Sequence, residues 1–267
     1  MHTEIERSII KKFRKKIWRR FVRAVEEFKL VNDNDKIAVC ISGGKDSMLL
    51  AKLLEELKRH GKIKFDLKYI VMDPGYNTKN LELIKTNLDK LNIDAEIFQS
   101  DIFDIIETNG GQSPCYLCAR MRRGCLYNKA KELGCNKIAL GHHFDDVIET
   151  IMLNILYAGE YKTMMPKLKS TNFKGLELIR PMYFVKEEDI IAWAKSNDLK
   201  FIDCACKMTS RTDNEGKRKE IKELIKNLKQ INDNVDINIL KSSYNINMES
   251  IIEYKKNNKK SNFLDKY

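Results

Sequence analysis

The sequence lacks the features that would place the chain in or across a membrane. No apolar run reaches the roughly 18 residues that a helix needs to span a bilayer. No signal-peptide pattern and no internal repeat are found either. We therefore expect a soluble, cytoplasmic protein without a membrane partner. With 267 residues and 43% hydrophobic content, the chain is long and apolar enough for one large domain with helical additions.

Acidic residues are outnumbered by basic ones, 38 against 49, which gives a net charge of +11. This excess favours a polyanionic partner, most simply nucleic acid, although a generally basic surface accounts for it equally well. Basic residues line one face of a helix predicted over residues 3–28, and apolar residues line the other face. We expect this helix to pack on the core and to present its basic face to nucleic acid or to solvent.

The common phosphate loop, Gly-x-x-x-x-Gly-Lys-Ser/Thr, is also missing. A different glycine-rich segment joins a predicted buried strand, 36–41, to a predicted amphipathic helix, 46–60. Successive backbone N–H groups at such a helix start form an anion site, to which serine hydroxyls and a lysine charge contribute. We expect a phosphate or pyrophosphate to bind here. The residues of this segment are Ser42, Gly43, Gly44, Lys45, Asp46 and Ser47.

Strand and helix patterns alternate through most of the chain, which predicts an α/β fold with a doubly wound parallel sheet. Ligands of such folds bind at the carboxyl ends of the strands, where the strand order reverses. Segments 71–76 and 140–143 should therefore line one crevice with the glycine-rich segment. The strands are predicted at 36–41, 67–72, 95–99, 136–140, 176–179 and about 200–203, and the helices at 46–60, 78–91, about 117–133, 145–157 and 186–197.

The alternation ends near residue 206, which suggests three regions. Residues 1–30 would be a basic helix packed on the core, 31–206 a nucleotide-binding α/β domain, and 207–267 a helical extension. A basic helix is predicted over 215–230, and the last residues, 255–267, are low in complexity and expected to be frayed.

A second polar motif, Gly141-His-His-Phe-Asp-Asp146, lies between a predicted strand and a predicted helix. Asp145 or Asp146 is a natural helix N-cap, but two adjacent acids also suit a Mg²⁺ ion that bridges phosphates. His142 and the histidine after it either contact nucleotide or substrate or are structural. Two later lysines, Lys162 and Lys167, either reach ATP or an RNA backbone or are simply solvated.

Four of the seven cysteines are paired in sequence, Cys115 with Cys118 and Cys204 with Cys206. Three chemistries fit this pattern. A [4Fe–4S] cluster would use the first pair and one later cysteine, a structural zinc would use all four thiolates, and a metal-free pair would carry persulfide sulfur. Arg120, Arg122 and Arg123 follow the first pair; they favour thiolate and are able to hold phosphate. Cys40, Cys125 and Cys135 are expected to be packing residues.

The glycine-rich segment resembles the PP-loop of the N-type ATP pyrophosphatases, which implies cleavage of ATP between its α- and β-phosphates. With four further motifs, the likeness extends over most of the chain and becomes close to the TtcA family, the tRNA 2-thiocytidine synthetases. These motifs are Pro114-Cys-x-x-Cys-x-Arg-x-Arg-Arg-Gly124 with Leu140-Gly-His-His-x-Asp-Asp146, Met165-Pro-Lys-Leu168 and Ile179-Arg-Pro-Met182.

The resemblance implies that ATP adenylates an anticodon-loop cytidine of tRNA, at position 32, and that sulfur then replaces its 2-oxygen. It implies a homodimer, a cysteine desulfurase as sulfur donor, and a [4Fe–4S] cluster on Cys115, Cys118 and a third cysteine. We favour Cys206 as that ligand, with Cys204 as the alternative, because this chain has Cys-x-Cys where the family has Cys-x-x-Cys.

Roles for individual residues follow from this reading. Asp46, Asp145 and Asp146 would bind Mg²⁺ or order the loop, and the two cysteines of the first pair would act in catalysis. Backbone around Val39, Val71 and Gly141, with His142, would receive the nucleoside. Arg120, Arg122, Arg123, Lys162 and Lys167 would contact tRNA.

Two other functions stay open at this point. One is another PP-loop modification of tRNA, either uridine thiolation or amine addition of the lysidine type, with a structural four-cysteine zinc. The other is a non-catalytic RNA-binding module that senses ATP.

Overall fold

The structure is a computed structural model that describes residues 4–109, 114–202 and 213–266. The side chains of residues 104, 107–116 and 203–215 lie outside this description. The chain separates into two compact units, of which unit 1 comprises residues 1–147 and 164–217. Unit 2 comprises residues 148–163 and 218–267.

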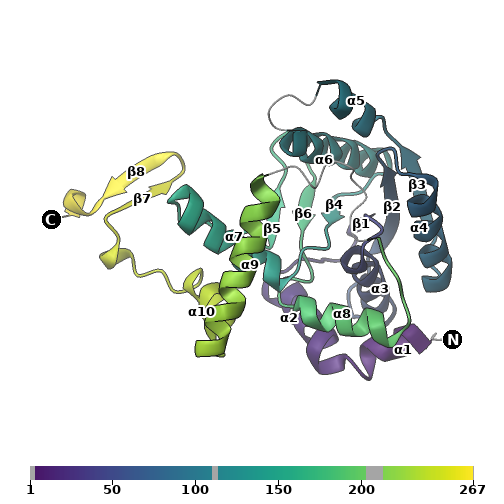
Figure 1. Ribbon diagram of the computed structural model, residues 1–267, viewed down its shortest axis with the longest axis horizontal. Coiled ribbons are helices and arrows are strands. Elements are labelled where there is room, and N and C mark those ends of the chain that lie inside the picture. The colour runs from purple at the N-terminus through teal and green to yellow at the C-terminus, as the bar shows by residue number, and fades with distance from the viewer. Residues whose placement is uncertain (1–3, 110–113, 203–212, 267) are drawn as a thin grey trace. The chain divides into compact units, whose positions relative to one another are not determined.

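A six-stranded sheet forms the centre of unit 1 (Figure 1). The strand order is β3-β2-β1-β4-β6-β5, and all neighbours are parallel except the edge strand β5, which runs antiparallel to β6. This arrangement confirms the predicted doubly wound α/β fold. The order reverses between β1 and β4, so the carboxyl ends of these strands frame the expected ligand crevice. The strands are β1 (Lys36–Ile41), β2 (Asp66–Asp73), β3 (Ala95–Gln99), β4 (Lys137–Ala139), β5 (Lys167–Lys169) and β6 (Glu177–Ile179).

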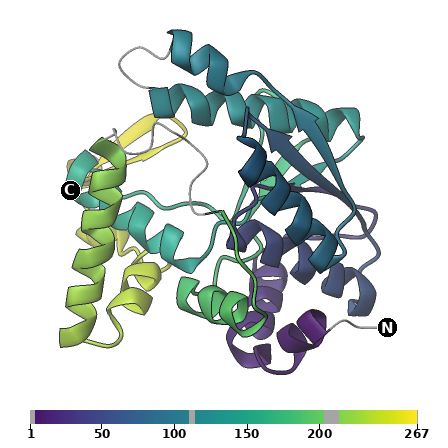
Figure 2. The same ribbon diagram turned by 45° about the vertical axis from the view of Figure 1, so that its right-hand side comes forward.

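Helices cover both faces of this sheet (Figure 2). Alternate residues of β1 belong to different core clusters, with Val39 and Ile41 on one face and Ala38 and Cys40 on the other. The first face packs against α3, α4, α8 and the N-terminal helices, and the second face packs against α6. The bounds are α3 (Lys45–His60), α4 (Thr78–Leu91), α5 (Ile102–Asn109), α6 (Pro114–Glu132) and α8 (Glu187–Ser196).

The N-terminal basic segment differs from the single helix predicted over residues 3–28. It consists of α1 (Glu4–Ile10), a π-helical turn (Arg14–Trp18) and α2 (Arg19–Glu27). At the break, the carbonyl of Phe13 accepts hydrogen bonds from the N–H groups of both Ile17 and Trp18. The wider turn keeps the Phe13 side chain in the core, which explains the departure from regular helix.

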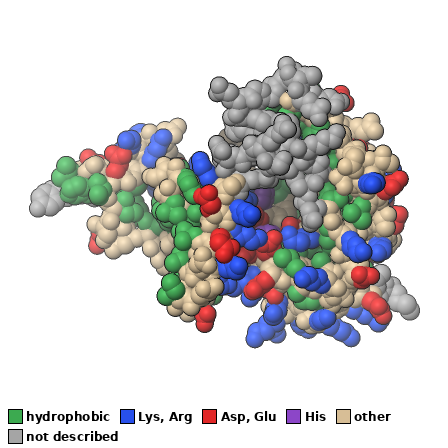
Figure 3. All heavy atoms as spheres, viewed as in Figure 1, with side chains coloured by type: hydrophobic (Ala, Val, Ile, Leu, Met, Phe, Trp, Pro, Cys, Tyr) green, Lys and Arg blue, Asp and Glu red, His purple; other side chains and the backbone are tan. Residues whose placement is uncertain are grey.

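The basic face predicted for this segment is present. Figure 3 shows Lys and Arg side chains gathered over the N-terminal helices of unit 1. One of them, Arg20, donates to buried Asp189 of α8 at 2.8 Å and so helps to fix α2 on the core. The exposed members are Lys11, Lys12, Arg14, Lys15, Lys16, Arg19 and Arg23.

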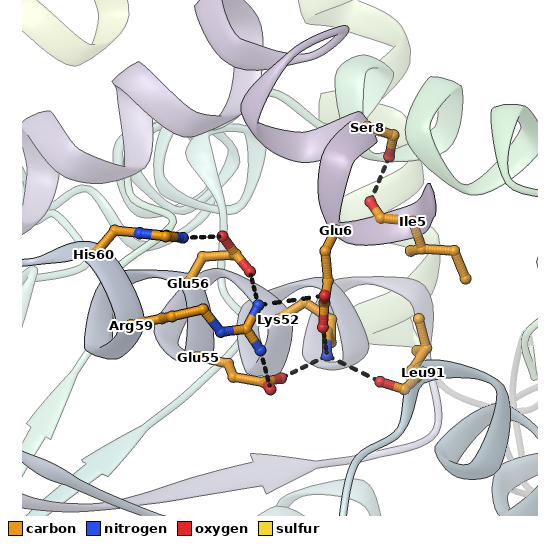
Figure 4. Close-up of polar contacts among 9 residues, drawn as sticks. All are labelled: Ile5, Glu6, Ser8, Lys52, Glu55, Glu56, Arg59, His60 and Leu91. Atoms are coloured by element: carbon orange, nitrogen blue, oxygen red, sulfur yellow. Dashed lines mark hydrogen bonds and ion pairs between the residues drawn. The ribbon is translucent and has the colours of Figure 1, made fainter. Parts of the chain in front are cut away.

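A buried network of charged side chains joins α1 to α3 (Figure 4). Lys52 has a side chain that is 1% exposed, and its Nζ lies 2.8 Å from Glu6 Oε1 and also pairs with Glu55. Arg59 pairs with Glu6 at 3.3 Å, with Glu55 at 3.1 Å and with Glu56 at 2.8 Å. Each of these carboxylates has a cationic partner, so the network is a self-sufficient structural contact.

The strand predicted at about 200–203 is not formed at residues 200–202, and residue 203 lies outside the description. The carbonyl of Lys200 accepts a hydrogen bond from the Asn87 side chain of α4 rather than from a neighbouring strand. Phe201 stacks on Trp193 of α8, with ring centroids 6.5 Å apart. These apolar residues therefore pack against helices, and their β-like pattern reflects burial alone.

Unit 2 contains helices and a small hairpin. Helix α7 (Phe144–Leu153) enters it and continues as a π-helical turn (Asn154–Ala158). The remaining elements are α9 (Asp213–Ile231), α10 (Val235–Ser242), β7 (Glu253–Lys256) and β8 (Lys259–Asn262). The hairpin replaces the frayed tail that we predicted, because Asn257 and Asn258 adopt the left-handed backbone that a tight hairpin turn requires. Within the described ranges, no helix is long and apolar enough to cross a membrane.

Candidate active site

The glycine-rich segment turns from β1 into α3 at the point where the strand order reverses. Gly43 has a φ of +84°, and a Cβ there would lie only 2.6 Å from Ile84. Gly44 is the extended N-cap of α3 and provides no side-chain hydrogen bond to the helix start. The first N–H groups of this 16-residue helix are therefore not capped by that residue, and they carry the positive end of the helix dipole. This geometry suits an anionic phosphate.

Two serines brace the loop from within. The hydroxyl of Ser47, which is almost fully buried, donates to the carbonyl of Gly44 at 2.9 Å and accepts from the N–H of Ser42 at 3.1 Å. The two serine hydroxyls are 3.2 Å apart. Because Ser47 bonds across the loop, its first effect is to hold the turn in shape.

Lys45 begins α3 and forms ion pairs with two carboxylates. Its Nζ lies 3.3 Å from Asp46 Oδ2 and 3.1 Å from Glu187 Oε1 at the start of α8. Burial alone would lower the pKa of the Lys45 ammonium, but Asp46 and Glu187 outweigh that effect and raise the pKa. Lys45 is thus held charged beside the loop. Sequence reasoning missed Glu187, which is distant in the chain and belongs to no local motif.

Gly141 brings the end of β4 against the first turn of α3. A Cβ at this position would be 3.0 Å from the backbone N of Ser47 and 3.1 Å from the carbonyl carbon of Asp46. Only glycine permits such a close approach of two backbones. The second polar motif therefore starts directly beside the phosphate-binding turn.

His143 stands among the carboxylates of both motifs. It is 6% exposed, and its Nε2 lies 3.8 Å from Asp46 Oδ1 and 3.5 Å from Asp146 Oδ2. Its Nδ1 lies 3.7 Å from Asp145 Oδ2. The structure thus brings together the three aspartates that the sequence singled out, with a histidine at their centre.

Asp145 and Asp146 also bond to the backbone. Asp146 Oδ2 accepts a hydrogen bond of 2.9 Å from the N–H of His143, as in a capping box at the start of α7. Asp145 Oδ2 accepts one of 2.7 Å from the N–H of Glu187 and so fixes the start of α8. Neither aspartate is the N-cap residue that the sequence suggested, because α7 begins at Phe144 and both lie in its first turn; each instead accepts a hydrogen bond from a backbone N–H at the start of a helix.

Asp46 has a carboxylate oxygen with unmet bonding capacity. Its Oδ1 is buried and has no hydrogen-bond partner. Burial raises the pKa of Asp46, and the neighbouring His143 and Lys45 offset only part of that effect. A buried carboxylate oxygen in this state fits a cation. Among the described side chains, no three His, Cys, Asp or Glu residues form a metal site by themselves.

The backbone predicted to receive the nucleoside lies at the carboxyl ends of three neighbouring strands, β2, β1 and β4. Val39 and Val71 are fully buried, near the carboxyl ends of β1 and β2, and His142 follows Gly141 after β4. All four positions flank the loop-forming edge of the sheet. A bound nucleoside would meet the loops after these strands, because Val39 and Val71 themselves are covered.

The loop after β2 contributes a residue that sequence reasoning did not assign. Asp73 Oδ1 accepts hydrogen bonds from the N–H groups of Gly75 and Tyr76, at 3.0 and 2.7 Å, and so shapes the turn. The Tyr76 hydroxyl then donates to the carbonyl of Ser42 at 3.4 Å, and its ring meets the edge of Phe103. The only sequence signal was the position of this segment at a strand end.

The basic and cysteine-bearing helix α6 is described in part. Arg122 lies over the ring of Phe103 at 5.3 Å, and its buried Nε has no hydrogen-bond partner. Arg120 and Arg123 are exposed. Cys118 is half-buried and packs against the apolar cluster of Met72, Ile102 and Ile106.

The other predicted cluster ligands lie outside the described residues: the side chain of Cys115, and Cys204 and Cys206 entirely. Cys40 and Cys135 are buried, as expected of packing residues, and burial, with Cys135 nearby, raises the pKa of Cys40 to about 12.

The two predicted lysines occupy different units. Lys167 starts β5 in unit 1, and its Nζ donates to the carbonyl of Lys29 at 3.2 Å. Lys162 belongs to unit 2, where it is exposed and lies 4.0 Å from Glu160. Neither contact links these lysines to the loop at the start of α3.

Comparisons with known proteins agree with this geometry. The PP-loop domain family matches residues 13–228. A tRNA-cytidine(32) 2-sulfurtransferase from Geobacter metallireducens is 36% identical over 233 residues, covering 86% of this chain and 90% of that protein. One of the same name from Syntrophotalea carbinolica is 39% identical and covers 83% of each chain. The solved structure of the U34-tRNA thiolase NcsA from Methanococcus maripaludis, with its [4Fe-4S] cluster, has a similar fold, with a TM-score of 0.68, 23% identity, and coverage of 85% of this chain and 76% of that one.

Proposed function

The chain belongs to the PP-loop family and, within it, to the tRNA-cytidine(32) 2-sulfurtransferases, and on this premise we propose that it uses ATP to replace the 2-oxygen of a tRNA cytidine with sulfur. Membership confirms the resemblance that the motifs indicated. The observation that carries the proposal is the meeting of two motifs at one place. The N-terminus of α3, with Lys45 beside it, lies against Gly141 and the aspartates that follow.

The phosphates of ATP would bind at the segment from Ser42 to Ser47. The helix N-terminus and the Lys45 ammonium both favour negative charge there. Lys45 now pairs with Glu187 and Asp46, so phosphate binding would exchange one set of anionic partners for another. The adenosine would extend over the loops that follow Val39, Val71 and Gly141, next to His142.

The residues around Asp46 fit a Mg²⁺ ion bound together with the nucleotide. Asp46 Oδ1 is buried and lacks a donor, Asp146 approaches the same Nε2 of His143 as Asp46 does, and Asp145 approaches Nδ1. Mg²⁺ commonly takes one or two carboxylates and completes its shell with phosphate oxygens and water. This agrees with the absence, among described side chains, of a ready-made group of three ligands. The bound ion would neutralise charge on the phosphates.

The cysteines would hold a [4Fe–4S] cluster, with Cys115, Cys118 and Cys206 as ligands and Cys204 as the alternative third. The described ligand fits this role: Cys118 is a cysteine near the start of α6, packed beside apolar side chains. A helix start favours thiolate, and an apolar surround limits solvent access. A cluster held by three cysteines leaves one iron that is able to carry sulfur.

The proposed reaction has two steps. The 2-oxygen of the cytidine attacks the α-phosphorus of ATP, and pyrophosphate leaves. A cysteine desulfurase would supply the sulfur as a persulfide, and an external thiol would reduce it to sulfide, itself becoming a disulfide. The sulfide then adds at C2, and AMP departs with the former 2-oxygen. Lys45 and the N–H groups of α3 would stabilise the charge that develops on the leaving pyrophosphate.

The tRNA would be held by positive charge outside the nucleotide loop. Arg120, Arg122 and Arg123 lie on α6, and the exposed basic residues of the N-terminal helices add a second region. Lys162 and Lys167 are further candidates. A homodimer, as the family resemblance implies, is part of the same proposal, and action on tRNA agrees with a cytoplasmic location.

The test is nucleoside analysis by mass spectrometry after incubation of anaerobically purified protein with tRNA, ATP, Mg²⁺ and a sulfur donor. We expect 2-thiocytidine at position 32 only when ATP is present. Cys118→Ala should abolish thiolation and leave ATP binding intact. The matched control is Cys125→Ala, a half-buried thiol on the same helix, which should retain activity.

Two results would contradict the proposal. Full thiolation by Cys118→Ala would exclude its role as a cluster ligand. Stoichiometric zinc without iron, together with ATP cleavage but no thiolated base, would favour an amine-adding enzyme, and tRNA binding without AMP release would favour a binding module.

A further inference from the structure

Arg180 is a buried cation without a carboxylate partner. It directly follows β6, at the same edge of the sheet as the nucleotide loop, and is 9% exposed (Figure 1). Its Nη1 donates to the carbonyl of Met165 at 2.5 Å, whereas its Nε is buried and has no hydrogen-bond partner. Among the described side chains, no carboxylate lies within ion-pair distance of it. A buried charge left in this state is costly.

The other buried cations of the described core are paired. Lys52 contacts Glu6 and Glu55, and Lys137 lies 2.8 Å from Asp35 and 3.5 Å from Glu177. Both lysines also donate to a backbone carbonyl. Arg180 has the carbonyl but lacks the carboxylate. This difference singles it out from cations whose role is to hold the fold together.

The groups around Arg180 act on the pKa of its guanidinium in both directions. Burial lowers the pKa of its guanidinium, and the nearby charge of Arg123 on α6 acts in the same direction. Tyr127, Tyr183 and the carboxylate of Asp146 raise this pKa and offset part of the effect of burial. Asp146 already accepts a hydrogen bond at the start of α7 and lies beside His143. The guanidinium remains charged at physiological pH, so it needs an anion from outside the chain.

We propose that Arg180, with Arg123 beside it, binds a phosphate group of the substrates and positions it next to the aspartates at the start of α7. This rests on the proposed function only for the origin of the phosphate, which is either the nucleotide or the tRNA backbone. A guanidinium suits the task because its planar donors match phosphate oxygens two at a time. Arg180 would thus be a binding residue that the sequence reading recorded only as part of the Ile-Arg-Pro-Met motif.

A stability signature separates this role from a structural one. If the role of Arg180 is to bind an anion, the neutral variant Arg180→Met removes an unpaired buried charge and should melt at the wild-type temperature or above it. Inorganic phosphate or pyrophosphate should raise the melting temperature of the wild type and have a much smaller effect on the variant. A structural arginine would behave in the opposite way, since its loss would lower the melting temperature.

The binding experiment has two further arms, both read by calorimetry. One titrates a non-hydrolysable ATP analogue without tRNA, and the other titrates tRNA without nucleotide at several salt concentrations. Arg180→Met should lose about 10- to 100-fold in affinity in the arm that supplies the phosphate. If the phosphate belongs to tRNA, the slope of log affinity against log salt concentration should decrease by about one, which corresponds to the loss of one phosphate contact. Arg180→Lys, which keeps the charge, should recover part of the loss.

The matched control is Arg59→Gln, which removes an arginine with carboxylate partners at the other end of α3. It should lower the melting temperature and leave both affinities unchanged. The inference would be overturned if Arg180→Met bound the ATP analogue and tRNA as tightly as the wild type does. It would also be overturned if Arg180→Met melted at a lower temperature than the wild type and phosphate stabilised both proteins equally. If the wild type binds neither ATP nor tRNA but responds to phosphate through Arg180, the proposed function fails and the inference stands.

Discussion

Helix α3 carries charged side chains at both ends, but the two groups are bonded differently. From the middle of the helix to its carboxyl-terminal end, Lys52 and Arg59 face glutamates that each have a cationic partner (Figure 4). At its amino-terminal end, Asp46 keeps a buried oxygen without a donor. Arg180, at the same edge of the sheet, keeps a buried nitrogen without an acceptor.

This difference distinguishes a structural group of charges from a site prepared for a ligand. A closed network satisfies its own charges and needs nothing further. Unmet bonding capacity in a buried group costs stability, and natural proteins retain such groups mainly where function requires them. Charged side chains of α3 thus stabilise the fold toward its carboxyl-terminal end and form part of the ligand site at its amino-terminal end.

The largest effect should come from breaking the closed network. Lys52→Met would leave Glu6 buried with one cation fewer, and we expect a loss of about 3–5 kcal/mol in the free energy of unfolding. Urea denaturation measures it. ATP binding by the folded fraction should stay unchanged. Adding Glu6→Leu to the same chain should recover part of the loss, and a strictly additive double mutant would contradict the network interpretation.

The next effect concerns the open end of the helix. Lys45→Ala should lower the rate of pyrophosphate release by about 10²–10³-fold, because a charge aimed at the leaving phosphates is lost. The change in unfolding free energy should stay within about 1 kcal/mol, since the lysine is partly exposed. Lys58→Ala, near the other end of α3, is the matched control and should retain the rate. A large loss of stability in Lys45→Ala would remove the distinction between the two ends.

A smaller effect is expected from crowding the contact between the two motifs. Gly141→Ala would place a Cβ 3.0 Å from the backbone N of Ser47 and push the nucleotide loop away from the aspartates. We expect a loss of about tenfold in kcat/KM for ATP, as small displacements of reacting groups produce. Gly216→Ala on α9 adds a Cβ in open space and should not change this value. Equal rates for both variants would show that the approach at Gly141 is not needed.

The smallest effect concerns the thiol of Cys40, which is buried and uncharged at neutral pH. Burial, with Cys135 nearby, raises the pKa of the Cys40 thiol from 9.0 to about 12. At pH 9, roughly one Cys40 in a thousand would be thiolate, against about half for an unshifted thiol. Raising the pH from 7 to 9 should therefore leave Cys40 unalkylated in the folded protein, as peptide mass spectrometry would record. Rapid labelling without unfolding would contradict its place in the core.

Much of the fold was predictable because local signals agreed with the final packing. Strands β1 and β3 and helix α4 have the predicted bounds, and Asn77 caps α4 through a side-chain bond to the N–H of Asn80. Helix α5 and strand β5 were not predicted. Both are short, and β5 lies at an edge, where pairing with β6 rather than sequence pattern decides the structure.

The site was predictable where residues are adjacent in sequence and not where the fold brings them together. The loop from Ser42 to Ser47 and the aspartates after Gly141 form recognisable motifs. Glu187, Tyr76 and Arg180 reach the same region from separate elements, and single residues of these types are common in any chain. Their roles follow from distances and burial that no local pattern contains.

The most direct test of the central claim, that this site adenylates a tRNA cytidine before sulfur enters, is to identify the products formed from ATP. The purified protein would be incubated with tRNA that carries cytidine or uridine at position 32, and AMP, ADP, pyrophosphate and thiolated nucleoside would be quantified together. We predict AMP and pyrophosphate in amounts equal to the 2-thiocytidine formed, with the cytidine-bearing tRNA only. Formation of ADP and phosphate, or AMP production independent of the base at that position, would contradict the claim.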